Sequence, residues 1–250
     1  MKSNYKITKD FENRIKKLEE KLGYKFRNKY IPLAAITHSS FVAEYKEKIQ
    51  DYEVLEFLGD AVIGLIVSEI LIKTFPNAKE GELSKIRSAV VSESYLARLA
   101  RKLGLNELVL LSRGEKAQKG MERETLLCDV FEAVFGAIYM DSDFSISPAR
   151  EVFNKHFKDY MIQCIKNDDI PQDYKSILQV YTQKKFKTVP KYKLIHEEGP
   201  EHNKEFTIQC TVDNFVKTTG KGKSKKEAET KAAQEAYKIL KEQNQNKDSN

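Results

Sequence analysis

Apolar residues recur at helical spacing through the first two thirds of the chain, from Phe11 to about Cys164. One run makes the pattern clear: Leu96, Leu99, Ala100 and Leu103. Side chains three and four residues apart lie on one face of a helix, and stretches that alternate between apolar and polar residues are few in this part. The pattern therefore predicts a mostly α-helical domain over residues 1–166.

The rhythm changes after a polar stretch at residues 167–172, which ends in a proline and a glutamine and is expected to be a linker. Beyond it, helical spacing is expected over residues 174–184 and 224–240. Between these helices, alternation typical of half-buried strands predicts a first strand at Tyr192, Leu194 and His196 and a second at Phe206, Ile208 and Cys210. A third strand is predicted within residues 211–219. The order predicts a small α+β domain, α-β-β-β-α, over residues 173–241, followed by a flexible polar tail at residues 242–250.

The formal charge of +6 is unevenly divided along the chain. Residues 171–250 hold 16 lysines and no arginine against 11 acidic residues, an excess of five, whereas the first 170 residues contribute an excess of one. A local positive excess favours a polyanion such as nucleic acid, although it is also common on ordinary protein surfaces. Charge alone leaves both interpretations open.

The chain has no apolar run near the ~18 residues that span a bilayer, and its start lacks the apolar stretch of a secretion signal. We therefore expect a cytoplasmic protein without a membrane partner. We also expect no small-molecule organic cofactor. Its three cysteines, Cys128, Cys164 and Cys210, lie far apart and lack CxxC spacing. We expect them to be reduced core residues, not a zinc or redox site.

Three acidic residues, Glu53, Glu56 and Asp60, lie at positions i, i+3 and i+7 of an otherwise apolar segment. A helix places all three on one face. The large apolar residues between them predict a helix buried on several sides, where an unpaired carboxylate is costly. A glycine inside a helix costs about 1 kcal/mol relative to alanine, so Gly59 indicates a close backbone approach.

A second apolar segment carries two more acids, Asp129 and Glu132, at i and i+3. If the two helices pack side by side, an all-oxygen pocket suited to Mg²⁺ or Mn²⁺ would be formed by Glu56, Asp60, Asp129 and Glu132. Acids at this spacing more often form surface salt bridges. Two apolar helices with the same feature, and the absence of Lys and Arg from residues 50–69, favour the metal site. No His or Cys lies near enough in the sequence to favour zinc.

These segments resemble the motifs of the ribonuclease III endonuclease family. EVLEFLGDAV at residues 53–62 is similar to the family's usual ERLEFLGDAV, and DVFEAVFGAIYMD at residues 129–141 is similar to its second acidic segment. THSS at residues 37–40 and KEGELS at residues 79–84 also fit, in the right order. Tyr52 stands where the family commonly has asparagine, and Val54 where arginine is usual.

By matching position, the resemblance implies the metal-binding acids Glu56, Asp60, Asp129 and Glu132. Among these, Asp60 and Glu132 would be the catalytic residues. Glu53 and Glu80 would have supporting roles towards RNA or a second metal.

The resemblance also implies an activity. We expect Mg²⁺-dependent hydrolysis of both strands of double-stranded RNA, with Mn²⁺ able to substitute, leaving 5′-phosphate and 3′-hydroxyl ends with short 3′ overhangs. The substrates would be ribosomal precursors and other structured transcripts. Family members pair, so we expect a homodimer in which Phe57 inserts into the partner subunit. Without the resemblance, Phe57 would equally well be an ordinary core residue.

The C-terminal domain carries its own motif. Ser224 and Glu227 have the spacing of a capping box, and two lysines in the next helical turn are unfavourable for the helix dipole but suit phosphate binding. KGKSKKEAETKAA at residues 221–233 and GPEH at residues 199–202 are similar to segments of the double-stranded-RNA-binding domain. Such a domain reads the shape of an RNA duplex across two minor grooves. The resemblance implies RNA contacts from Gln179, Gln183, His202, Lys225 and Lys226.

Other interpretations are weaker. His38 beside Ser39 and Ser40 lacks the arrangement of a catalytic triad, and Cys128 is expected to be an inert buried thiol. Residues 113–123 are expected to form a mobile loop, and in the family the corresponding loop can lie against RNA. The main alternative function is a protein that binds double-stranded RNA without cutting it, and a third is a structural dimer. The presence of all four acids favours the enzyme.

Overall fold

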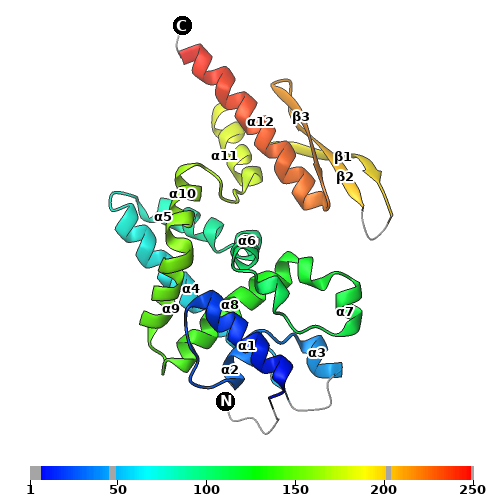
Figure 1. Cartoon of the computed structure of the whole chain (residues 1–250). Helices are drawn as coiled ribbons and strands as arrows, with labels where there is room; N and C mark the ends of the chain where they lie inside the picture. Colours follow the sequence, from blue (N-terminus) through cyan, green and yellow to red (C-terminus); the bar gives the residue numbers. More distant parts are fainter. Residues whose placement is uncertain (1–6, 45–48, 201–203, 249–250) are drawn as a thin grey trace. The chain divides into compact units, whose positions relative to one another are not determined.

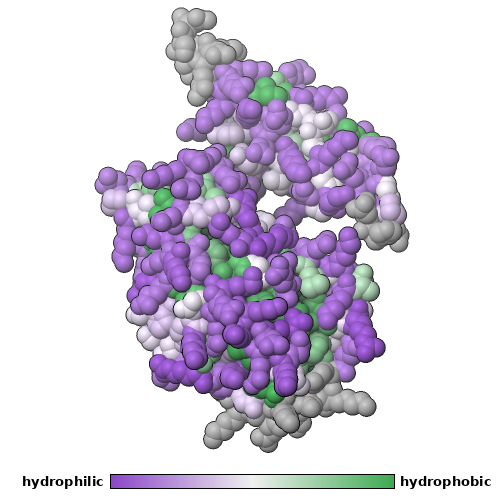
Figure 2. All heavy atoms as spheres, viewed as in Figure 1, coloured by the Kyte–Doolittle hydropathy of each residue, from purple (hydrophilic) through white to green (hydrophobic). Residues whose placement is uncertain are grey.

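The computed structural model describes residues 7–44, 49–200 and 204–248, and the chain divides into two compact units, Met1–Pro171 and Gln172–Asn250. Each unit is described by itself (Figure 1). Hydrophilic side chains cover most of the face seen in Figure 2, as 32% charged residues would require. The predicted fold class, a helical domain followed by an α-β-β-β-α domain, is confirmed.

The N-terminal unit is built from helices. In the described residues these are α1 (Lys9–Leu22), α2 (Tyr30–Ala35), α3 (Ser39–Glu44), α4 (Glu53–Thr74), α5 (Glu80–Val90), α6 (Glu93–Leu103), η1 (Leu105–Glu107), α7 (Arg113–Ala117), η2 (Gly120–Glu122), α8 (Glu124–Asp141), α9 (Ile146–Phe153), the π-helical η3 (Asn154–Lys158) and α10 (Asp159–Lys166). Residues 113–123, expected to be a loop, instead form α7 and η2. The ion pair between Arg123 and Glu115 joins the ends of this segment.

Helices α4 and α8 form the centre of the N-terminal unit and pack on each other more extensively than any other pair of elements. Both are apolar on most sides. On α8, Phe131 and Phe135 are fully buried and make edge-to-face contacts with Phe157 and Phe153, respectively. Helix α6 covers α8 with its apolar face, on which Leu99 is fully buried, as the sequence predicts.

The backbones of α4 and α8 come into close contact at two glycines. A Cβ atom added at Gly59 would collide with the backbone carbonyl oxygen of Glu132, and one added at Gly136 would collide with that of Leu55. Each glycine therefore receives the backbone of the opposite helix. The close approach predicted from Gly59 is confirmed, and its partner is α8.

Asp141, the last residue of α8, ties the segment after α1 to the helical core. Its buried carboxylate accepts hydrogen bonds from the hydroxyl of Tyr24 (2.9 Å) and from the backbone N–H groups of Arg27 (2.9 Å) and Asn28 (3.0 Å). A buried carboxylate is tolerated where such donors surround it. Three donors from one loop fix the route of the chain into α2.

The C-terminal unit comprises α11 (Tyr174–Phe186), an antiparallel sheet in the order β1-β2-β3, and α12 (Lys225–Asp248). The strands are β1 (Lys191–Glu198), β2 (Glu205–Val212) and β3 (Val216–Gly222). Helix α12 packs on β2 and β3, and α11 packs on α12. The small residues Ala228, Ala232 and Ala236 are fully buried and allow this close contact, as the sequence predicts.

Three details differ from the sequence prediction. Strand β1 is largely exposed instead of half-buried, because it is an edge strand of the sheet and α12 packs on β2 and β3. The third strand begins at Val216, since Thr211 continues β2. Helix α12 continues to Asp248, beyond the expected end at residue 240, because residues 241–248 contain no glycine or proline to stop it.

Gly59→Ala should push α4 away from α8 and lower the free energy of unfolding of the N-terminal unit by about 1–3 kcal/mol or more, since backbone blocks the added methyl group. The measurement is the midpoint of urea unfolding.

The matched control is Gly81→Ala in α5, where an added Cβ meets nothing within 4 Å. It should change stability by less than about 1 kcal/mol and in the favourable direction. Equal effects of the two substitutions would contradict the close-contact explanation.

Candidate active site

The three acids of α4 occupy its first two turns. Glu53 and Asp60 are exposed, whereas Glu56 is half-buried at the edge of the contact with α8. Asp60 follows Gly59 directly, and the backbone of Glu132 lies against that glycine. The glycine contact therefore brings the acidic turn of α4 to the acidic turn of α8.

The two acids of α8, Asp129 and Glu132, are both half-buried. The charges of Asp60, Glu56 and Asp129 all raise the pKa of Glu132, and those of Asp129 and Asp60 raise the pKa of Glu56. Carboxylates influence one another in this way only when they are near. The structure therefore brings together the four acids predicted to converge. Glu53 also raises the pKa of Glu56 and so lies beside them.

The electrostatics of this cluster are those of a site that lacks positive charge. Burial, followed by the three neighbouring carboxylates, raises the pKa of Glu132 to about 8, and burial is also the largest cause of the raised pKa values of Glu56 and Asp129. Within the part of the chain that the structure describes, neither Lys nor Arg forms a salt bridge with any of these acids. Clustered carboxylates with no cationic side chain suit a hard divalent cation, so the residues present fit Mg²⁺ or Mn²⁺.

The sequence does not predict two side chains that lie among the acids. The hydroxyl of Tyr52 donates a hydrogen bond to Oδ2 of Asp129 (3.2 Å), although the two residues are 77 positions apart. Sγ of Cys128 lies within 4.8 Å of carboxylate oxygens of Asp129 and Glu132, so the expectation that no cysteine is near the site is wrong. Burial and the neighbouring acids raise the pKa of the Cys128 thiol, which stays protonated, and all three cysteines are free and buried as expected.

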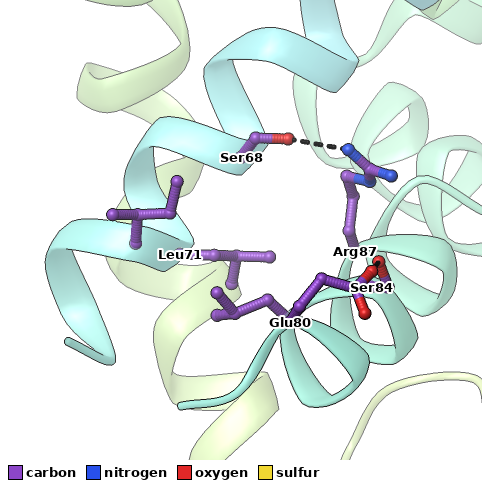
Figure 3. A pocket seen from close by; sticks show the side chains of 7 residues that line it. Ser68, Leu71, Glu80, Ser84 and Arg87 are labelled. Carbon is purple, nitrogen blue, oxygen red and sulfur yellow. Dashed lines mark hydrogen bonds between the residues drawn. The ribbon is translucent and has the colours of Figure 1, made fainter. Parts of the chain in front are cut away.

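Glu80 lies elsewhere in the unit. It is exposed in the first turn of α5, accepts a hydrogen bond from the Ser84 hydroxyl (2.8 Å), and lines a pocket of about 350 Å³ between α4 and α5. Figure 3 shows this α4–α5 pocket, with Ser68 and Leu71 contributed by α4. Leu71 is eleven residues beyond Asp60, or about 16 Å along the helix. Within one chain, Glu80 is therefore not brought to the other acids.

Phe57 is 83% exposed, so its interpretation as an ordinary core residue is wrong. It belongs to an apolar stripe on α4, which we name the α4 stripe and which consists of Val54, Phe57, Leu65 and Ile72. All four side chains are more than half exposed. Apolar residues repeated along one face of a helix and left uncovered indicate a protein interface.

The residues predicted to contact RNA lie in the C-terminal unit. Gln179 and Gln183 are exposed one turn apart on α11, and Lys225 and Lys226 are exposed in the first turn of α12. His202 lies outside the described residues.

The start of α12 is capped much as predicted. Ser224 Oγ accepts a hydrogen bond from the backbone N–H of Glu227 (3.1 Å). The Glu227 carboxylate accepts one from the N–H of Lys223 (2.7 Å), one residue before the expected partner. The Glu227 carboxylate forms its salt bridge with Lys231, and no described salt bridge joins it to Lys225 or Lys226.

None of the helices in the described parts of the chain is both long and apolar enough to cross a membrane. Residues 28–160 match the family model described as Ribonuclease-III-like, and residues 174–240 match the model of the double-stranded RNA binding motif. The first match covers more than half of the chain.

Proteins named Ribonuclease 3 are similar over most of the chain. That of Fusobacterium nucleatum is 46% identical over 217 residues, which cover 86% of this chain and 91% of its own. That of Borreliella burgdorferi is 43% identical over 239 residues, with 95% and 96% covered, and that of Aquifex aeolicus is 41% identical over 228 residues, with 91% and 98% covered.

Among solved structures, a nuclease domain of ribonuclease III from Campylobacter jejuni is similar with a TM-score of 0.51 and 39% identity, covering 57% of this chain and 98% of that one. Its description refers to structural flexibility in a region involved in dimer formation. Together with the acidic motifs on α4 and α8, these similarities show that the chain belongs to the ribonuclease III family of double-strand-specific endoribonucleases and carries a double-stranded-RNA-binding domain after its nuclease domain.

Proposed function

We propose that this protein uses Mg²⁺, or Mn²⁺ in its place, to hydrolyse both strands of double-stranded RNA, leaving 5′-phosphate and 3′-hydroxyl ends with short 3′ overhangs. The observation that carries the proposal is the meeting of four carboxylates from α4 and α8 without a cationic side chain to neutralise them. Processing of ribosomal precursors and other structured transcripts, and a cytoplasmic location, stay predictions.

The residues that would hold the cation are Glu56, Asp60, Asp129 and Glu132. When bound, the cation activates a water molecule and neutralises charge on the scissile phosphate. In its absence Glu132 keeps a proton at neutral pH, because its pKa is about 8. Glu132 must release this proton to act as a ligand. Asp60 is exposed beside it, which makes these two the residues best placed to orient the reacting phosphate.

Binding of the duplex falls to the C-terminal unit. Lys225 and Lys226 stand at the N-terminus of α12, where free backbone N–H groups and the helix dipole also favour phosphate. Gln179 and Gln183 on α11 would contact the minor groove, as would His202. A basic unit that holds RNA thus serves a nuclease unit whose own charge is almost balanced.

We also propose that the protein is a homodimer held by the α4 stripe. Phe57 is too large and too exposed to be left in water without cost. The α4–α5 pocket is lined by Leu71, Ile72 and Leu83 and offers an apolar surface of the kind that would receive it from a partner (Figure 3). Two nuclease sites in one dimer would account for cutting both strands, with Glu53 and Glu80 in supporting roles.

The decisive experiment separates cleavage from binding. Glu132→Gln keeps the size of the side chain but removes its charge, so it should lower the rate of cleavage of a labelled RNA duplex in Mg²⁺ by at least about 100-fold while duplex binding is unchanged. Gel mobility shift measures the binding. Cleavage at the wild-type rate would contradict the role of Glu132 and would leave the alternative, a protein that binds the duplex without cutting it, to explain the RNA-binding domain.

The converse control changes binding and leaves the acids intact. Lys225→Glu with Lys226→Glu should weaken duplex binding and lower the slope of log affinity against log salt by about 2, because each lysine that contacts a phosphate contributes about 1. An unchanged slope would exclude phosphate contact by these lysines.

Stability should depend on pH through Glu132. Its pKa is about 8 in the folded protein against an ordinary value of 4.5, so the folded state binds the proton more tightly than the unfolded state. The melting temperature of the metal-free N-terminal unit should therefore fall as the pH rises from about 4.5 to 8, by about 2–4 °C for each kcal/mol lost. Mg²⁺ should restore more stability at pH 8 than at pH 5.5.

Glu132→Gln is the control for this measurement, because glutamine does not titrate. Calorimetry of the two proteins over the same pH range should give a flatter profile for the variant. Parallel profiles would assign the pH dependence to other groups.

The dimer is tested by Phe57→Asp. A charged side chain in an apolar pocket is costly, so light scattering should find a monomer of about 28.8 kDa where the wild type has twice this mass. Phe144→Asp is the matched control, since Phe144 is an exposed phenylalanine of the same unit outside α4. Dimers of both variants would contradict the assignment of the α4 stripe.

A further inference from the structure

Tyr52 stands immediately before α4 and reaches across to the acids of α8. Its side chain is buried, with only 5% of the residue exposed, and its hydroxyl donates to Oδ2 of Asp129 at 3.2 Å. The backbone carbonyl of Tyr52 accepts the N–H of Glu56 (2.8 Å), which is the first hydrogen bond of α4. One residue is thus connected to a metal-binding acid on each helix.

The segment at residues 37–40, which no step of the proposed function uses, holds Tyr52 in place. The backbone carbonyl of Thr37 accepts the N–H of Tyr52 at 3.0 Å, and Thr37 itself is buried with its hydroxyl donated to Leu33. The ring of His38 packs edge-on against the ring of Tyr52, with centroids 5.7 Å apart. Backbone and ring of Tyr52 are therefore both fixed.

His38 is fixed in turn. Its backbone N–H donates to the carbonyl of Leu110 (3.0 Å), and its Nδ1 lies 2.8 Å from the hydroxyl of Ser40. The motif at residues 37–40 thus acts on the acids through Tyr52.

The hydroxyl of Tyr52 is the donor in its contact with Asp129, because a carboxylate oxygen accepts. Burial and the charge of Asp129 raise the pKa of its phenol far above the ordinary value of 10.0. The hydrogen bond lowers the pKa of Asp129, against the effect of burial. The hydroxyl therefore favours a carboxylate at Asp129 without contributing a charge of its own.

We propose that Tyr52 is a positioning residue of the metal site: its hydroxyl holds the carboxyl group of Asp129 in one orientation before the divalent cation binds. The inference rests on the proposed function, since it presupposes that Asp129 is a ligand. Groups that hold ligands in this way commonly contribute 10–100-fold to metal affinity.

The test is Tyr52→Phe, which deletes one oxygen and keeps the ring against His38. Mn²⁺ binding to the full-length protein without RNA is followed by electron paramagnetic resonance of the free ion. We expect the dissociation constant to rise about tenfold. The Mn²⁺ concentration for half-maximal cleavage should rise by a similar factor, while duplex affinity and the circular dichroism of the metal-free protein stay unchanged.

Tyr24→Phe is the matched control. Its hydroxyl also donates to a carboxylate of α8, that of Asp141 at 2.9 Å, but at the far end of the helix from the acids. This variant should bind Mn²⁺ as the wild type does. Equal weakening in both variants would show that loss of any such bond loosens α8, and would overturn the positioning role of Tyr52.

A double-mutant cycle covers the case in which Tyr52→Phe alters folding. In an Asp129→Asn background the substitution should have no further effect on Mn²⁺ affinity, because the oxygen that it positions has lost its charge. Additive effects would overturn the inference. Failure of the proposed function is distinguishable: the wild type itself would then bind Mn²⁺ no better than the Glu132→Gln variant.

Discussion

The backbone contact between α4 and α8 is the constraint on which the rest of the nuclease unit depends. At Gly59 the carbonyl of Glu132 occupies the space of a side chain, and at Gly136 the carbonyl of Leu55 does the same. Because the two backbones are in contact, the residues that flank each glycine lie against the opposite helix. Asp60 and Glu56 must face the turn that carries Asp129 and Glu132, so a packing requirement decides where the chemistry takes place.

Bringing these acids together destabilises the folded state, and binding of a cation would remove this destabilisation. Apolar helices surround the acids and exclude water on one side, which raises the pKa of Glu132 to about 8 and also raises those of Glu56 and Asp129. A protein selected for stability alone would pair such acids with Lys or Arg, as it does with Arg150 and Glu69 elsewhere in the same unit. The unpaired acids are therefore best understood as the part of the fold in which stability is given up for function.

How much the sequence predicts depends on how local each feature is. The helical period alone predicts that Glu56 and Asp60 share one face of α4. Gly59, a glycine inside a helix, predicts that another backbone packs closely against it. The same reasoning fails for β1, an edge strand that stays exposed because α12 packs on β2 and β3, although alternation predicts half-burial. It also fails for Tyr52, whose partner Asp129 is 77 residues away, and for Glu80, whose motif places it in the right order but at the other end of α4. Period and motif order carry no information about such distances.

The neighbours of the acids share one chemical property. Tyr52 donates a hydrogen bond from a hydroxyl and Cys128 from a thiol, and burial keeps both groups protonated and neutral. A lysine in either place would orient the carboxylates equally well, but it would also neutralise them and occupy the position of the cation. Neutral donors fix the direction of a carboxylate and leave its charge in place. The site can therefore be ordered and still attract a divalent ion. This explains why the contacts from Tyr52 and Cys128, which order the acids, come from uncharged groups.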